Sequence, residues 1–258
     1  MSDKKIKHDI CTYNIFIDAL WKSGNLELAM KVFNNVTETG LTPDVVAYNT
    51  LINGLCRVGS VTSALELLNE MQSLGQNPDV VTYNTLLHGL CKRLLISEAI
   101  QLFRVMSDKK IKHDICTYNI FIDALWKSGN LELAMKVFNN VTETGLTPDV
   151  VLFNTMINGL CRAGLQDEAY DVFLRMEETG CEANEIIFNS MVQGLAQGKK
   201  NSNLMKLLHE MEERGFFLQE YVVSMLTKEF SKDELEAETL QMIQKLFPMG
   251  RKQNHRTE

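Results

Sequence analysis

The chain has 258 residues, of which 45% are hydrophobic and 23% charged, a composition typical of globular proteins rather than disordered or collagen-like ones. Acidic residues outnumber basic ones by 33 to 26, for a net charge of −7. This charge excludes a uniformly basic nucleic-acid binder, so any such binding requires a local basic stripe. No apolar run approaches the ~20 residues that a membrane-spanning helix needs. The six cysteines form no C-x-x-C pair, which favours reduced thiols.

Six segments of the sequence recur at intervals of 35 residues, as in VVAYNTLINGLCRVG from Val45 and VVTYNTLLHGLCKRL from Val80. Residues 1–46 are also identical to residues 106–151, an offset of three whole repeats. We therefore expect repeats at residues 10–44, 45–79, 80–114, 115–149, 150–184 and 185–219. Residues 1–9 match the end of the third repeat. They are expected to be the tail of a truncated preceding repeat, within a longer parental array.

Each repeat predicts two helices. With positions numbered from the first residue of a repeat, positions 4, 7, 8 and 11 are aromatic or aliphatic and lie within an arc of ~100°. Glycine at position 15, such as Gly59, ends the first helix. A second helix follows, with alanine at position 20. Because one helix pair cannot bury its apolar face alone, neighbouring repeats must stack. The predicted fold is all-α, a right-handed α-solenoid of helix-turn-helix repeats.

The repeat pattern stops after residue 219. Residues 220–247 predict C-terminal capping helices, the last of which is opened by a capping box at Ser231 and Glu234. Residues 248–258 are expected to form a flexible tail.

A second face of each first helix carries residues that recur without a packing reason. Positions 2, 5, 9 and 13 fall within an arc of ~80°, roughly opposite the apolar face. Position 2 is small to medium-sized and apolar, position 9 is polar, and position 13 is basic in the first five repeats. Position 5 is asparagine in every repeat, although asparagine is a mediocre residue inside a helix. This row predicts either a polar ladder that ties repeats together or a surface for a repeating ligand such as a polynucleotide.

Position 35 is aspartate in the first four repeats and directly precedes the next first helix. N-capping alone would explain an aspartate there. Capping and recognition of a ligand are compatible, so both interpretations stay open at this point.

The sequence contains no motif of a P-loop, a zinc protease, a nucleophile elbow or a dinucleotide-binding site. The five histidines are scattered through the chain, without metal-ligand spacing. We therefore expect no enzyme activity, no catalytic residue, no metal and no cofactor.

These repeats resemble the pentatricopeptide repeat family, specifically its P class, and the VVTYNTLLHGLCK string resembles restorer-of-fertility-like members in plants. The resemblance covers residues 10–219. It implies an organellar protein, mitochondrial with the chloroplast as the alternative, that binds single-stranded RNA with one base per repeat. It implies no membrane partner and no small-molecule substrate. A role in RNA processing, stability or translation follows, with a recruited RNA-processing enzyme as a further partner.

The resemblance also implies roles for individual residues. Positions 5 and 35 together select the base, and these residues are Asn14, Asp44, Asn49, Asp79, Asn84, Asp114, Asn119, Asp149, Asn154, Asn184 and Asn189. Position 2 sandwiches the base, through Cys11, Val46, Val81, Cys116, Val151 and Ile186. The basic residue at position 13 is expected to contact phosphates, and these residues are Lys22, Arg57, Lys92, Lys127 and Arg162. The implied pyrimidine-rich footprint is 5′-UUUUCY-3′, in which the sixth base rests on the unusual pair of Asn189 and Gln219.

The alternative is a tetratricopeptide-like scaffold that binds an extended peptide in its groove. Alanine at position 20 suits both families. The 35-residue period, the recurrent asparagine and the line of basic residues favour RNA, since peptide binding requires none of them.

Overall fold

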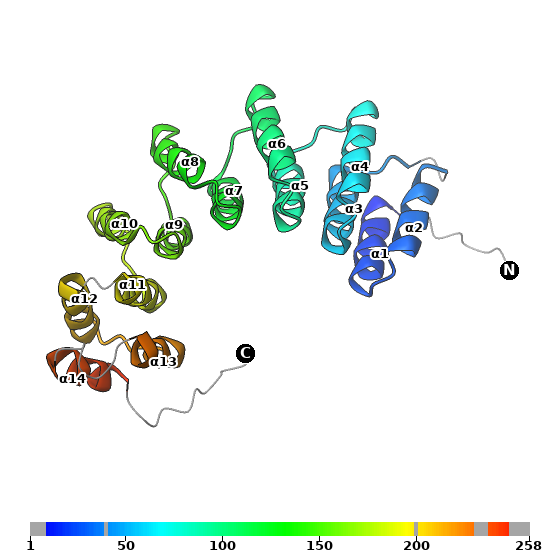
Figure 1. Cartoon of the computed structure of the whole chain (residues 1–258). Coiled ribbons are helices and arrows are strands. Elements are labelled where there is room, and N and C mark those ends of the chain that lie inside the picture. The colour runs from blue at the N-terminus through cyan, green and yellow to red at the C-terminus, as the bar shows by residue number, and fades with distance from the viewer. Residues whose placement is uncertain (1–8, 39–40, 199–200, 230–236, 248–258) are drawn as a thin grey trace. The chain divides into compact units, whose positions relative to one another are not determined.

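The structure is a computed structural model that describes residues 9–38, 41–198, 201–229 and 237–247. Within these ranges it contains fourteen helices and no strand (Figure 1), which confirms the all-α class. The expected capping box at Ser231 and Glu234 and the tail at 248–258 lie outside the described residues, as does the segment 1–9 apart from Asp9.

Two helices form in each 35-residue interval. The first helices begin at position 1 of a repeat, and they are α1 (Ile10–Lys22), α3 (Val45–Val58), α5 (Val80–Lys92), α7 (Ile115–Lys127), α9 (Val150–Arg162) and α11 (Glu185–Gln197). The second helices are α2 (Leu26–Glu38), α4 (Val61–Ser73), α6 (Ile96–Asp108), α8 (Leu131–Glu143), α10 (Gln166–Glu178) and α12 (Asn201–Glu213). Beyond the repeats lie α13 (Glu220–Glu229) and α14 (Ala237–Leu246).

The chain divides into two compact parts, Met1–Val137 and Phe138–Glu258. In the N-terminal part, α3 packs on α1, α4 and α5, and α5 packs in turn on α6 and α7. In the C-terminal part, α9 packs on α10 and α11, and α11 packs on α12 and α13. First helices therefore contact both their own second helix and the first helix of a neighbouring repeat, which is the stacking that the apolar pattern predicts.

The buried face of each first helix carries the residues that the pattern assigns to it. Tyr48, Leu51 and Ile52 are fully buried, and alanines at position 20, such as Ala64, are fully buried on the second helices. Neighbouring first helices approach closely at position 10. A Cβ atom added at Gly89 would lie 2.6 Å from the Sγ atom of Cys56, so only glycine fits between α3 and α5 at this spacing.

The duplicated sequence shows how strongly burial depends on the neighbouring repeat. Phe16 in α1 and Phe121 in α7 occupy the same position of identical segments. Phe121 is only 2% exposed, because its ring stacks on Phe103 of α6 with a centroid distance of 4.4 Å. Phe16 is 59% exposed. The same apolar residue is thus a core residue only where a preceding helix pair lies against it.

The turns between helices need left-handed backbone at two positions of a repeat. At position 15, Gly59 caps α3 with a φ of 90°, and at position 31, Gly75 and Gly145 have φ values of 74° and 81°. The third repeat departs from this pattern, because Leu94 and Lys110 adopt φ values of 57° and 58° at these same two positions. A residue with a Cβ atom is strained in this conformation by roughly 1–2 kcal/mol.

Replacing Lys110 with glycine should therefore stabilise the protein by about 1 kcal/mol, since glycine adopts the left-handed conformation without a steric penalty. The measurement is the free energy of unfolding from urea denaturation. Lys109→Gly is the control, because Lys109 is also exposed and has an ordinary φ of −80°, although this substitution additionally removes a hydrogen bond from Lys109 Nζ to Gln72. That control should be neutral or destabilising, and equal effects of both substitutions would contradict the role of backbone strain.

Candidate functional site

An exposed row of apolar residues follows position 2 of the first helices. Val46, Val81, Val151 and Ile186 are each between 54% and 58% exposed, and the two cysteines at this position, Cys11 and Cys116, are exposed as well. Isolated apolar residues on a surface are ordinary, but these six recur at the same place in every repeat. Within each of the two parts, these side chains therefore offer one exposed apolar contact per repeat.

The asparagine at position 5 and the aspartate at position 35 meet at joints between repeats. In the N-terminal part, Nδ2 of Asn14 donates to both carboxylate oxygens of Asp44, at 3.0 and 3.2 Å. Nδ2 of Asn84 donates to Oδ1 of Asp114 at 3.0 Å. Nδ2 of Asn49 donates to Oδ1 of Asp79 at the longer distance of 3.4 Å. At these three joints the pair therefore links one first helix to the residue that caps the next first helix.

The same aspartates cap the first helices. Asp44 accepts a hydrogen bond from the amide of Ala47 at 2.9 Å, and Asp114 accepts one from the amide of Thr117 at 2.7 Å. Burial by itself would raise the pKa of Asp114, but hydrogen bonds from Thr117 and Asn84 outweigh it and hold the pKa below its usual value. The Asp114 carboxylate is therefore charged at neutral pH and acts only as a hydrogen-bond acceptor.

The asparagines are not fully satisfied by the hydrogen bonds to these aspartates. The Oδ1 atoms of Asn14, Asn49 and Asn119 are buried and have no hydrogen-bond partner among the described residues. A buried polar atom without a partner costs about 1–3 kcal/mol, so this recurrent cost needs a reason. The Asn84 oxygen differs, because the Thr117 hydroxyl lies 2.7 Å from it.

The last two repeats place their asparagines differently. In the fifth repeat, Oδ1 of Asn154 accepts a hydrogen bond from Asn158 at 3.1 Å, and Asn184 caps α11 by accepting from the Ile187 amide. In the sixth repeat, Asn189 is completely buried, and its Nδ2 donates to the carbonyl oxygens of Glu185 and Phe217.

The Asn189 side-chain oxygen in turn accepts a hydrogen bond from the backbone N–H of Gln219 at 2.8 Å. This environment favours a structural role for Asn189, tying α11 to the segment before α13. Its place at position 5 of the repeat predicts instead that Asn189 selects a base.

The basic residues at position 13 are all exposed, but they are not equivalent. Lys22 pairs with Asp18 at 2.7 Å, and Lys127 pairs with Asp123 at 2.5 Å. In the second, third and fifth repeats, position 9 is Asn53, His88 and Asn158, so no carboxylate stands there. The Arg57 guanidinium lies over the Trp21 ring of the preceding repeat, 5.3 Å from its centroid.

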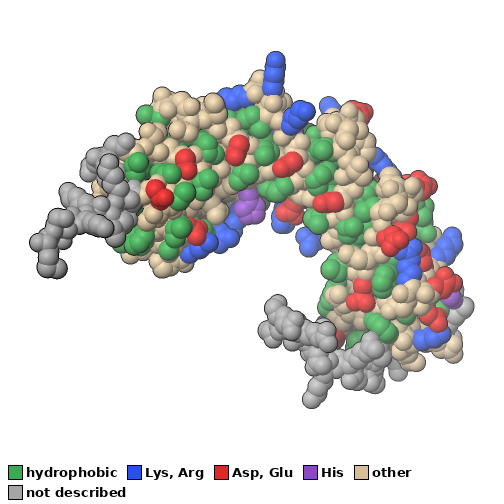
Figure 2. Space-filling view, turned by 180° about the vertical axis from the view of Figure 1, so that it is seen from behind, with side chains coloured by type: hydrophobic (Ala, Val, Ile, Leu, Met, Phe, Trp, Pro, Cys, Tyr) green, Lys and Arg blue, Asp and Glu red, His purple; other side chains and the backbone are tan. Residues whose placement is uncertain are grey.

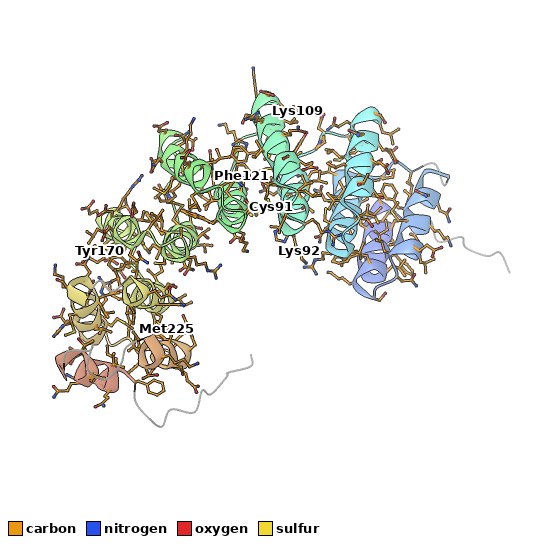
Figure 3. All side chains as sticks on the ribbon, in the orientation of Figure 1. Cys91, Lys92, Lys109, Phe121, Tyr170 and Met225 are labelled. Carbon is orange, nitrogen blue, oxygen red and sulfur yellow. The ribbon has the colours of Figure 1, made fainter. Side chains whose placement is uncertain are left out.

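These features converge in a cleft of about 800 Å³ on the first helices of the N-terminal part. Its wall includes Val81 and Cys116 at position 2 and the linked pair Asn84 and Asp114. Arg57, His88 and Lys92 also line it, and Lys92 lies near the C-terminal end of α5 (Figure 3). The volume falls within the range of about 300–1,000 Å³ that is usual for ligand sites.

Charged side chains of both signs lie on the face of the molecule that Figure 2 shows. Figure 2 shows acidic and basic side chains interspersed among hydrophobic ones within each part. Attraction for a phosphate therefore depends on individual cations along the first helices.

Two of the buried cysteines have thiols that are poor nucleophiles. Burial raises the pKa of Cys56 to about 11 and that of Cys91 to about 12, so both thiols are protonated and poorly nucleophilic. Among the described residues no group of three His, Cys, Asp or Glu side chains could hold a metal ion.

None of the described helices is long and apolar enough to cross a membrane.

Two features of the site were not identified from the sequence. The first is the Thr117 hydroxyl at Asn84, and the second is the pairing of position 9 with position 13 in the first and fourth repeats. Spacing could have revealed the second feature, since Asp and Lys four residues apart on a helix are neighbours. The first depends on the contact between repeats.

Comparison with solved structures supports the fold. The pentatricopeptide repeat protein PPR10 from maize is 25% identical, with a TM-score of 0.67 over 91% of this chain and 34% of that one. PPR10 in complex with an 18-nt psaJ RNA element is 22% identical, with a TM-score of 0.60, and 94% of this chain and 39% of that one are covered.

The PPR domain of Arabidopsis thaliana protein-only RNase P 1 in complex with tRNA is 20% identical, with a TM-score of 0.59 over 69% of this chain and 94% of that one. The chain thus spans little more than a third of the PPR10 chains that it matches.

Sequence comparison points to the same family. No curated protein sequence matches the chain significantly. The profile of a pentatricopeptide repeat domain matches residues 1–57, and a PPR repeat profile matches residues 186–216. The profile of the PPR repeat family matches residues 43–92, 78–127, 113–151 and 148–197. Because these last matches cover more than half of the sequence, the chain belongs to the PPR repeat family.

Proposed function

We propose that this protein binds single-stranded RNA along the row of first helices, one base per repeat. The observation that carries the proposal is the cleft whose wall includes Val81 and Cys116 together with the linked pair Asn84 and Asp114. Exposed apolar side chains and a polar pair in one cleft suit a flat base that is stacked on its faces and read at its edge. Solved relatives bound to RNA and tRNA support this proposal.

The edge contacts follow from the hydrogen-bond inventory. Asn84 uses one N–H of its amide on Asp114, which leaves its second N–H for a base acceptor such as O4 of uracil. Arg57 and Lys92 line the same cleft and supply cations for phosphates. The arrangement binds and positions RNA, and no catalytic step is proposed for it.

On this basis the proposed footprint is 5′-UUUUCY-3′, read by the six repeats in order. The geometry at Asn189 weakens the case for the sixth base, because its amide is engaged with the backbone. We further propose a P-class, restorer-of-fertility-like role in a mitochondrion or chloroplast. There the bound protein would block nucleases, unfold competing RNA structure or position a recruited processing enzyme.

A peptide-binding scaffold is the competing function, since a row of exposed apolar residues also suits an extended peptide. The Asn–Asp pairs argue against it, because a peptide has no need of the same polar pair at three successive joints. Fluorescence anisotropy with labelled RNA separates the two functions.

The protein should bind 5′-UUUUCU-3′, flanked by neutral spacers, at least about ten-fold more tightly than 5′-AAAAGA-3′, because its polar pairs suit pyrimidine edges. Fluorescence anisotropy measures both affinities, with circular dichroism as a check on folding. A folded protein that binds neither strand would overturn the proposal, and equal affinity would remove the base reading.

The double substitution Asn84→Ser and Asp114→Asn should move the preference at the third base towards a purine, because the shorter serine leaves room for the larger ring. Asparagine is as good an N-cap as aspartate, so the start of α7 and the folding of the variant are preserved. Affinities for oligonucleotides that vary only at the third base measure the shift. The preference at the second base is the internal control, and an unchanged third-base preference would refute base reading at this joint.

Asp123→Asn should raise RNA affinity about three-fold, because it removes the carboxylate that pairs with Lys127. The slope of log K against log[salt] should steepen by about 0.7, the value for one added phosphate contact. Glu66→Gln is the matched control, since it makes the same change in net charge at an exposed site on α4. An equal gain in the control would show a general charge effect and contradict a contact at Lys127.

A further inference from the structure

The joint between the third and fourth repeats contains a hydroxyl that no base-reading role includes. Thr117 at position 3 of the fourth repeat is fully buried, and its Oγ1 lies 2.7 Å from Oδ1 of Asn84. We propose that Thr117 determines base specificity at the third repeat by fixing the orientation of the Asn84 amide. The proposal rests on the RNA-binding function above and concerns the preference for uracil over cytosine.

Chemistry assigns the orientation of this amide. The Asp114 carboxylate can only accept, so the Asn84 atom 3.0 Å from it must be the NH₂ group. The Asn84 oxygen then faces Thr117, whose hydroxyl must donate. The same Oγ1 accepts from the Asp114 amide at 3.2 Å, which turns its lone pair away from Asn84.

A competing acceptor lies beside this hydroxyl. Oδ1 of Asp114 is 2.8 Å from Thr117 Oγ1, but it already accepts from the Thr117 amide at 2.7 Å and from Asn84. Donating the single proton to Asn84 satisfies an oxygen that is otherwise without a partner. Both ends of the Asn84 amide are then occupied, and rotating it by 180° would bring its oxygen against a carboxylate.

Amide orientation decides which pyrimidine fits. With its oxygen held by Thr117, Asn84 presents only an N–H donor to the cleft, which suits O4 of uracil. A rotated amide would present its oxygen, which suits the N4 amino group of cytosine. Thr117 thus opposes the orientation that would accept cytosine, while touching no base itself.

The preceding joint provides a natural comparison. Asn49, Asp79 and Thr82 are the same three residue types, yet Thr82 Oγ1 contacts Asp79 at 2.9 Å and the Asn49 oxygen has no partner. The contact from Asn49 to Asp79 is also longer, at 3.4 Å. Both threonines complete a capping box at the start of their helix. They therefore share a structural role and differ in their contact with asparagine.

The test compares Thr117→Val with Thr82→Val. Valine keeps the shape of threonine and removes the hydroxyl, so each variant loses the same capping interaction. Thermal unfolding should confirm that both variants are folded at the temperature of the binding assay. RNA affinities are then measured for 5′-UUUUCU-3′ and for variants with cytosine at the second or third base.

Thr117→Val should reduce the preference for uracil over cytosine at the third base about five-fold, which is the range for loss of one hydrogen bond. It should leave the second base unaffected, and Thr117→Ser should restore the preference. Thr82→Val should leave the second-base preference unchanged. Retention of the third-base preference in Thr117→Val, or equal losses in the two variants, would overturn the role of this contact.

If the proposed base reading itself is wrong, the experiment gives a different result from the one expected if only the role of Thr117 is wrong. A wild-type protein that binds RNA without preference at the third base would remove base reading, and this inference with it. A wild-type protein that prefers uracil there, together with an unaffected Thr117→Val variant, would refute only the inference.

Discussion

The aspartate that precedes a first helix joins folding to recognition. Asp114, the last residue of the third repeat, caps α7 of the next repeat through the Thr117 backbone amide and accepts a hydrogen bond from Asn84 of its own repeat. Because capping places the carboxylate at the joint, the asparagine at position 5 of the same repeat is oriented by the carboxylate that starts the next first helix. A repeat is therefore incomplete without its successor, and the recognition surface forms only as the repeats stack.

The fold could be predicted from the sequence because the six repeats can be compared with one another, position by position. Positions 4, 7, 8 and 11 recur six times, and the stacking of first helices follows from the need to bury them. Burial of individual residues could not be predicted in this way. Phe16 and Phe121 share an identical segment but are 59% and 2% exposed, since burial depends on the adjacent repeat.

The candidate site could be predicted as a row of positions, but the state of each member depends on its local partners. The sequence treats the six asparagines alike. In the sixth repeat, however, position 35 is Gln219 and not an aspartate, and the amide of Asn189 is bound to the backbone. Lys22 and Lys127 likewise match Lys92 in sequence position, yet each pairs with an aspartate four residues earlier. Position in the repeat identifies the side chains that could contact RNA. Hydrogen bonds within the protein decide which of them have donors or acceptors left for that contact.

The unpaired asparagine oxygens suggest how affinity and specificity are divided along the row. At Asn14 and Asn49, the amide is held at one end only, so its orientation is set by one contact with a carboxylate. At Asn84, Thr117 holds the other end as well. Preorganisation of this kind lowers the cost of binding the matching base and raises the cost of binding another. Repeats with the same pair of base-selecting residues can therefore differ in selectivity, because a hydroxyl from the next repeat determines how firmly the amide is held.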